Sequence, residues 1–257
     1  MSSPLKVFIT GASSGIGLAL AAEYARRGAI LGLVARRGEA LAAFQQSHPQ
    51  NSISTYSVDV RDAEALADAA AQFIAQHGLP DVVIANAGIS RGALTGHGDL
   101  RTFREVMDVN YFGMVATFEP FAAAMVVAKK GTLVGIASVA GVRGLPGSGA
   151  YSASKSAALK YLEALRVEMR PLGVGVVTIA PGYVRTPMTE HNPYSMPFLM
   201  DADRFAVKVA GAVERQTRFA VFPWQMRVVA MLLHVLPRRV YDLVFERAPR
   251  KPRAVTE

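Results

Sequence analysis

The stretch Thr10-Gly11-Ala12-Ser13-Ser14-Gly15-Ile16-Gly17 decides the fold of this chain. A short apolar run, Leu5 to Ile9, comes before it, and a helical pattern from Gly15 to Arg27 follows at once. The three glycines let the backbone turn tightly and approach a pyrophosphate, whose charge is met by the positive end of the helix dipole. Glycines in loops are often only turn residues. Because these stand between a strand and a helix, they predict a dinucleotide-binding βαβ unit.

Short apolar runs and helical patterns alternate up to about residue 180. Repeated βαβ units with right-handed crossovers build a doubly wound parallel sheet. We therefore expect an α/β protein of the Rossmann type, with residues 1–257 in one domain and residues 221–257 as its C-terminal helical extension. The predicted strands are 5–10, 30–35, 53–58, 81–85, 131–137 and 174–179, and the predicted helices include 15–27, 62–77, 100–128 and 150–169.

The composition limits the class of protein. Of the 257 residues, 51% are hydrophobic and 19% are charged, which favours one sizeable core and excludes a disordered polymer. Cysteine is absent, so disulfides and thiolate metal sites are excluded, and we expect no metal centre. The first ten residues carry no signal-peptide pattern, so we expect a cytoplasmic protein.

The net charge of +8 is distributed unevenly. Residues 221–257 hold seven basic side chains against three acidic ones. A basic balance is compatible with nucleic acid, anionic lipid or an anionic cofactor as partner. These basic residues are not interleaved with a nucleic-acid reader motif, so we expect no nucleic-acid partner.

Two arginines, Arg36 and Arg37, follow the second predicted strand, and no acidic residue stands beside them. In a dinucleotide fold this strand end faces the adenosine ribose, where an acid accepts from a 2′-hydroxyl and an arginine accommodates a 2′-phosphate. The pair predicts NADP(H) in preference to NAD(H). The alternative is a solvated basic turn before the helix that starts near Gly38.

Tyr151 and Lys155 stand four residues apart on a predicted helix and therefore share a face. Ser138 comes directly after the strand at 131–137, at the carboxyl edge of the sheet, where open α/β sheets bind ligands. A Tyr-x-x-x-Lys pair by itself is weak evidence, since it also occurs on solvated helix faces. Together with the glycine stretch and Ser138 it becomes specific.

These features together resemble the compact, single-domain branch of the short-chain dehydrogenase/reductase family, over about residues 5 to 190. One departure is Ala85, where the family often has a second Asn before Asn-Ala-Gly. The resemblance rests on Thr10 to Gly17, Asp59, Val60, Asn86, Ala87, Gly88, Asn110, Ser138, Tyr151, Lys155, Pro181, Gly182 and Thr186.

The resemblance implies a cofactor site. Asp59 and Val60 would flank the adenine, Asn86 to Gly88 would close the floor, and Thr186 would bond the nicotinamide carboxamide. Tyr151 and Lys155 would also touch the cofactor. The remaining expected contacts are Gly11, Ser13, Ser14, Gly15, Ile16, Gly17, Arg36, Arg37, Pro181, Gly182 and Val184.

The implied reaction moves a hydride between the nicotinamide and a carbonyl or alcohol carbon. Tyr151 would be the general acid/base, with its pKa lowered by Lys155 and by the nicotinamide charge. Ser138 would hold the carbonyl oxygen, and Lys155 would also fix the nicotinamide ribose. Asn110, in a helix that the family kinks, would hold a water that relays protons from Lys155 to solvent.

Two other interpretations of the function remain open. A dinucleotide-binding scaffold or sensor could keep the fold without the chemistry, although it need not retain Asn110, Ser138, Tyr151 and Lys155 together. Relatives that epimerise nucleotide sugars usually carry a longer C-terminal substrate domain.

The substrate pocket is expected between residues 139–149, where Arg143 is the charged exception, and residues 188–200. The second segment mixes methionines, aromatics and prolines, which favours a mobile lid over an apolar substrate, whereas the plain alternative is a connecting loop. His191 in this segment could touch substrate or lie in solvent.

The tail predicts two helices. Apolar residues run from Met226 to Leu236, and after Pro237 a second stripe is formed by Val240, Tyr241, Leu243 and Val244. The apolar run is too short for a transmembrane span. Residues 223–253 therefore suit either a peripheral membrane contact or packing against the core or a second subunit. We expect a homodimer or homotetramer, since the family's C-terminal elements often pack that way.

Overall fold

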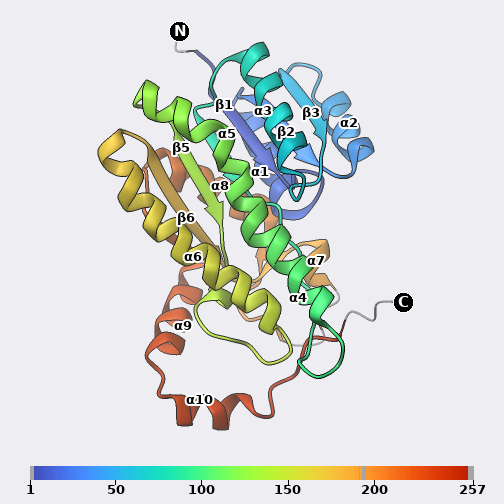
Figure 1. The fold of residues 1–257 in the computed structure, drawn as a ribbon, viewed down its shortest axis with the longest axis vertical. Helices are drawn as coiled ribbons and strands as arrows, with labels where there is room; N and C mark the ends of the chain where they lie inside the picture. The colour runs from blue at the N-terminus through green and yellow to red at the C-terminus, as the bar shows by residue number, and fades with distance from the viewer. Residues whose placement is uncertain (1–2, 191, 193–194, 254–257) are drawn as a thin grey trace.

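The computed structural model describes residues 3–190, 192 and 195–253. Its centre is a parallel sheet in the order β3-β2-β1-β4-β5-β6-β9 (Figure 1). The strand order reverses at β1 and β4, which makes the sheet doubly wound and confirms the predicted fold class. The strands are β1 (Lys6–Thr10), β2 (Ile30–Ala35), β3 (Ile53–Ser57), β4 (Val82–Ala85), β5 (Thr132–Ile136), β6 (Gly175–Pro181) and β9 (Phe219–Phe222).

Helices cover both faces of this sheet (Figure 1). A short parallel pair, β7 (Val184–Arg185) and β8 (Met200–Asp201), lies outside it. The α-helices are α1 (Gly15–Arg26), α2 (Gly38–Ser47), α3 (Ala63–His77), α4 (Leu100–Met107), α5 (Gly113–Ala128), α6 (Gly149–Met169), α7 (Pro187–Glu190), α8 (Ala202–Glu214), α9 (Trp224–Val235) and α10 (Arg238–Phe245).

Strand β1 shows how both faces are buried. Val7 and Ile9 point to one side, into a core that also contains residues of α1 and α8. Phe8 points to the other side, with its ring centroid 5.5 Å from Phe73 of α3 and 4.9 Å from Phe121 of α5. Because side chains alternate along a strand, a strand covered on both faces must be apolar throughout, as the predicted runs are.

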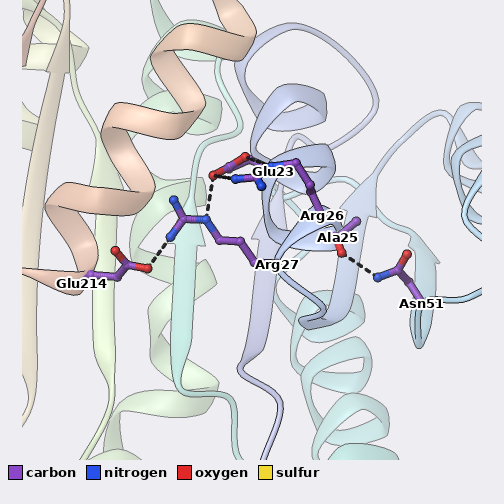
Figure 2. Close-up of polar contacts among 6 residues, drawn as sticks. All are labelled: Glu23, Ala25, Arg26, Arg27, Asn51 and Glu214. Carbon is purple, nitrogen blue, oxygen red and sulfur yellow. Dashed lines mark hydrogen bonds and ion pairs between the residues drawn. The ribbon is translucent and has the colours of Figure 1, made fainter.

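An ion-pair network ties α1 to α8 (Figure 2). Glu23 is buried, and its carboxylate accepts from Arg26 at 2.9 Å and from Arg27 at 2.6 Å. Arg27 also pairs with Glu214 at the end of α8. The hydrogen bond from Arg26 is the largest cause of the lowered pKa of Glu23. In the same region, the Asn51 amide donates to the carbonyl of Ala25 at 2.8 Å, which fixes the end of α1 to the loop before β3.

The chain from Leu100 to Ala128 is one continuous helical stretch, as predicted, and by length and hydropathy it is apolar enough to cross a membrane. Here it packs on the sheet, with Phe118, Phe121 and Met125 buried in the core. A π-helical turn, Asp108–Phe112, separates α4 from α5. Such turns change which side chains face the core, and this one carries Asn110.

The last strand, β9, differs from the prediction. It adds to the edge of the sheet by pairing with β6, from Thr178 opposite Phe219 to Pro181 opposite Phe222. Four residues are too few to show a strand period in the sequence, and this run merges with the apolar tail. Residues 221 and 222 therefore belong to the sheet, and the C-terminal extension begins at Pro223.

The extension consists of α9, α10 and a strap, which we define as residues 246–253. Met226 and Ala230 of α9 are buried, and Met226 packs with Ala180 and Val221. Helix α10 lies below the carboxyl edge of the sheet, and the strap returns from it towards α4 (Figure 1). There Arg253 forms a parallel bridge with Gly92. The tail is helical as predicted, but one face of α9 packs on the core.

Candidate active site

The glycine loop between β1 and α1 is packed too tightly for side chains at its key positions. A Cβ atom at Gly17 would lie 2.1 Å from the carbonyl oxygen of Gly11, and one at Gly11 would lie 2.7 Å from the Ala87 Cα. Gly11 also has a φ of +69°, a conformation that glycine adopts without strain. The Asn86 side chain donates to the carbonyls of Thr10 at 3.0 Å and Gly11 at 3.2 Å. The loop after β4 therefore holds the glycine loop in shape.

A cleft of about 300 Å³ opens at the carboxyl edge of the sheet, above this loop. Two of the predicted site residues, Gly17 and Asn110, do not line the cleft. Gly17 supports the glycine loop by lying against the Gly11 carbonyl. The predicted residues that line the cleft are Gly11, Ser13, Ser14, Gly15, Ile16, Arg36, Arg37, Asp59, Val60, Asn86, Ala87, Gly88, Ser138, Tyr151, Lys155, Pro181, Gly182, Val184 and Thr186.

One end of the cleft is basic. The Arg37 guanidinium donates to the Ser13 hydroxyl at 3.2 Å and to the Ser13 carbonyl at 3.3 Å, which joins the end of β2 to the glycine loop. Asp59 lies here too, but Arg61 pairs with it at 2.6 Å and holds its pKa below the usual range, with a smaller contribution from Arg36. The Asp59 charge is thus balanced by Arg61, and Arg36 and Arg37 stay available to an anion.

The other end carries the three residues expected to do chemistry. Tyr151 and Lys155 come from the first turns of α6, and Ser138 follows β5. The Lys155 ammonium donates to the carbonyl of Ile136 at 2.8 Å and lies 6.0 Å from the centre of the Tyr151 ring. All three side chains line the cleft, so the structure brings together what the sequence placed on separate elements.

Burial is the largest cause of the pKa shifts of both Tyr151 and Lys155. Burial raises the pKa of Tyr151, opposed by a hydrogen bond from Ser138. Burial also lowers the pKa of Lys155 to about 8. Desolvation disfavours the charged form of either group, which for Tyr151 is the tyrosinate and for Lys155 is the ammonium.

Asn110 is fully buried and its amide is occupied by protein groups. Its Oδ1 accepts from the Ile89 backbone N–H at 2.8 Å, and its Nδ2 donates to the Ile89 carbonyl and to the Ser154 hydroxyl, both at 2.9 Å. Ser154 in turn donates to the Tyr151 carbonyl at 2.8 Å. The Asn110 side chain thus joins the π-helical turn to the backbone of α6.

Several cleft residues escaped the sequence reasoning. Thr189 is the most informative, because its hydroxyl accepts from the Thr186 backbone N–H at 3.1 Å and donates to the Val184 carbonyl at 2.7 Å. Threonine three residues after Thr186 in a short helix is a capping signal that could have been read. The other lining residues outside the predicted site are Ala35, Val58, Ile89, Val109, Ile136, Ala137 and Pro187, whereas Met188 and Thr189 belong to the segment 188–200 expected to bound the substrate pocket.

Of the two segments expected to bound the substrate pocket, 188–200 contributes Met188 and Thr189 to the lining of the cleft, and the loop 139–149 contributes no residue. Arg143 does not point into the cleft's lining; its guanidinium donates to the Leu233 carbonyl at 3.2 Å and stacks over the Tyr241 ring at 4.4 Å. Met188 lines the cleft. His191 lies outside the described residues. Among residues 3–190, 192 and 195–253, no cluster of three His, Asp or Glu side chains could hold a metal ion.

Comparison with known proteins decides the family. The family described as short chain dehydrogenase matches residues 6–195. This chain belongs to the short-chain dehydrogenase/reductase family. A relative from Myxococcus xanthus, named an uncharacterized oxidoreductase, is 36% identical over 241 residues, which cover 93% of this chain and 95% of the relative.

Solved structures of this dehydrogenase family have the same fold. A short chain dehydrogenase from Burkholderia cenocepacia, in complex with NADP, superposes with a TM-score of 0.81 at 25% identity, over 96% of this chain and 99% of that one. A second, from Burkholderia phymatum in complex with NAD, has a TM-score of 0.82 over 98% and 99% of the two chains, and its 23% identity supports the fold alone.

Proposed function

We propose that this short-chain dehydrogenase/reductase is an NADP(H)-dependent oxidoreductase that transfers a hydride between the nicotinamide and a carbonyl or alcohol carbon. The observation that carries the proposal is the convergence of Ser138, Tyr151 and Lys155 on one cleft whose other end is basic. A silent scaffold would have no need of the buried Lys155 beside the partly buried Tyr151, since burying a charge costs stability.

The cleft fits a dinucleotide on geometric grounds. The glycine loop keeps its shape because Gly11 and Gly17 carry no Cβ atoms, and α1 begins at the same place, where the N-cap residue Ser14 makes no side-chain hydrogen bond to the first turn. The residues that would hold the pyrophosphate are Ser13 to Ile16, and Thr186 lies against Gly15, where an added Cβ would be 3.2 Å away. When bound, the nicotinamide supplies or accepts the hydride.

Tyr151 is proposed to move the proton. Its raised pKa keeps the hydroxyl protonated, so it can donate to a carbonyl oxygen as negative charge develops there. Ser138 stabilises the same oxygen by a second hydrogen bond. Lys155, with a pKa of about 8, is charged at neutral pH and offsets the charge left on Tyr151. Asn110 is a positioning residue in this scheme, because it acts on α6 through Ser154.

The preference for NADP(H) is proposed from Arg36 and Arg37. Arg37 already contacts Ser13 of the glycine loop, so a 2′-phosphate at this end would meet guanidinium groups in a partly formed site. The solved relatives bind NADP in one case and NAD in another, so the preference rests on these two side chains.

An apolar substrate in the cytoplasm is proposed from the character of the pocket walls. The charge of Arg143 is engaged by the extension, which leaves the loop 139–149 without a free charged group.

We also propose that the protein forms a homodimer or homotetramer. Phe112 is exposed on the outer side of the long helix, beside a second cavity lined by Val115 and Pro120.

The function is tested by following NADPH oxidation with aldehydes and ketones of increasing chain length. We expect turnover with apolar carbonyls and its loss in Tyr151→Phe, on the order of 10²–10⁴-fold, because that variant removes only the transferable proton. NADPH binding, measured by calorimetry, serves as the control and should persist. Near wild-type turnover in Tyr151→Phe would contradict the assignment.

A further inference from the structure

Helix α9 is apolar on two opposite faces. Met226 and Ala230 are buried against the sheet. The opposite face is an exposed stripe of large apolar side chains spaced as on one side of a helix, each between 47% and 72% exposed. We call this the α9 stripe; it consists of Trp224, Val228, Met231, Leu232 and Val235. Surface helices normally present polar residues outward, so this stripe marks a contact surface.

Helix α10 also has an exposed apolar face. Tyr241 and Phe245 stack on each other at 4.3 Å, and the Tyr241 hydroxyl donates to the carbonyl of Gly144, so this face of α10 is turned to the body. Val240, Leu243 and Val244 occupy the outer face and are between 44% and 76% exposed. The sequence had placed Tyr241 in one stripe with these three, and the structure separates it from them.

The charges around these apolar residues are mostly positive. Asp242 and Glu246 are the acidic residues in the described part of the extension. Its exposed basic residues are Arg227, Arg238, Arg239, Arg247, Arg250 and Arg253, of which Arg253 pairs with Asp99. If a second copy of this chain covered the face through a two-fold axis, the same arginines would meet each other and repel. An anionic surface would meet them with the opposite charge.

We propose that α9 and α10 dock this protein on an anionic lipid bilayer, with the α9 stripe and the outer face of α10 entering the headgroup region. Helices of 12 and 8 residues cannot span a bilayer, which needs about 20 apolar residues, but they can lie in its surface. Trp224 at the start of α9 suits that depth, since its ring is apolar and its N–H is polar. The basic residues would contact the lipid phosphates.

The docking face adjoins the loop 139–149, which the sequence predicts as a wall of the substrate pocket. Arg143 of the loop 139–149 contacts both α9 and α10. Met226 fills the space behind Gly182 of the cofactor site, where an added Cβ would lie 2.5 Å from its Cγ. The bilayer would therefore adjoin the mouth through which an apolar substrate enters. This last step rests on the proposed function, whereas the docking itself does not.

The test is flotation of the full chain with neutral phosphatidylcholine vesicles and with vesicles that also contain phosphatidylglycerol. Trp224 is the sole tryptophan of the sequence, so its fluorescence reports on α9 directly. We expect flotation with the anionic vesicles, weakened by salt, together with a blue shift of the emission and its quenching by brominated lipid.

Two variants assign the effect to this face. Met231→Asp combined with Leu232→Asp should abolish flotation, and Arg239→Glu combined with Arg247→Glu should remove the preference for anionic vesicles. Val127→Asp is the matched control, because Val127 is 85% exposed at the end of α5, away from the extension. Each variant is checked for an unchanged melting temperature.

The outcomes separate the possibilities. Absence of flotation in both lipids, or flotation that survives the Met231 and Leu232 changes, overturns the proposal. So does a wild-type dimer in sedimentation that those changes convert to a monomer, because the face would then belong to a second copy. None of these measurements depends on turnover, so an inactive protein would still be informative, and failure of the proposed function would be seen separately.

Discussion

The glycine loop and the C-terminal extension flank the same cleft but are held in different ways. In the loop, backbone lies against backbone, and a single added Cβ at Gly17 would overlap the Gly11 carbonyl. In the extension, α10 reaches the body through Tyr241, and the strap ends in polar contacts and in one close approach at Gly92, where an added Cβ would lie 2.1 Å from the Pro252 carbonyl oxygen. The loop is thus determined by close packing, which tolerates little change, whereas α10 and most of the strap are held by a few separable contacts. Substitutions should therefore act on the whole fold in the first region and locally in the second.

Gly17→Ala is expected to have the largest effect. The new Cβ must displace backbone, so we expect the free energy of unfolding to fall by about 3 kcal/mol or more, with loss of measurable NADPH binding. Urea unfolding and calorimetry measure the two quantities. Gly144→Ala is the control, since a Cβ there would meet open space. Equal stability losses in the two variants would show that packing in the loop is not special.

The buried ammonium of Lys155 gives a pH-dependent prediction for the cofactor side. Its pKa is about 8 in the folded protein against 10.5 for an ordinary lysine, so between these values the unfolded chain binds more protons. Stability should therefore rise with pH across this window, relative to Lys155→Met, by up to about 3 kcal/mol. Denaturant unfolding of both proteins from pH 7 to 10.5 measures the difference. Parallel curves would mean that Lys155 is not desolvated.

Arg36→Ala and Arg37→Ala test the role of the basic end of the cleft in cofactor binding. Each should weaken NADPH binding by about 1–3 kcal/mol, as expected for a charge-assisted hydrogen bond to a 2′-phosphate, and leave NADH binding nearly unchanged. Competitive calorimetry measures both affinities. Arg218→Ala is a suitable control because Arg218 is exposed before β9. Equal NADPH and NADH affinities in the unmodified protein would contradict the NADP(H) preference.

Asp99→Asn should have the smallest and most local effect. Arg253 donates to both oxygens of the Asp99 carboxylate at 2.8 Å, and this contact is the largest cause of its pKa of about 2. The substitution should release the strap and speed its hydrogen exchange while the sheet keeps its protection. Because the folded pKa lies below 3.8, the wild-type contact should persist at pH 4 and weaken only as the pH falls towards 2. Exchange measured by mass spectrometry follows both effects.

The C-terminal strap has a second contact that tests the same idea. Lys251 donates to the Ser90 hydroxyl at 2.7 Å, next to the bridge between Gly92 and Arg253. If the strap is held by separable contacts, Ser90→Ala should add to the effect of Asp99→Asn rather than replace it. A Ser90→Ala change that unfolds the whole protein would remove the distinction between the two regions.

The local signals of this chain were sufficient for the cofactor half. Glycines between a strand and a helix, apolar runs of strand length, and residues four apart on one helix are all short-range patterns, and each follows from backbone geometry. For this reason the doubly wound sheet could be predicted, whereas Asp59, Asn86 and Thr186 were expected in the cleft only from the resemblance to the short-chain dehydrogenase/reductase family. Thr189 could have been added on the same grounds, because it closes a turn with Thr186 only three residues away.

The features that only the tertiary structure decided depend on contacts between residues that are distant in sequence. Strand β9 forms because β6 offers a free edge for pairing, and a run of four apolar residues does not by itself predict a strand there. The raised pKa of Tyr151 follows from burial, which depends on every element around the cleft. Asn110 is occupied by Ile89 and Ser154 for the same reason. Helix α9 is apolar on two opposite faces, and the sequence of a helix cannot specify which of two apolar faces the core will cover. Only the packing of α9 on the sheet decides that Met226 is buried while Met231 and Leu232 are exposed.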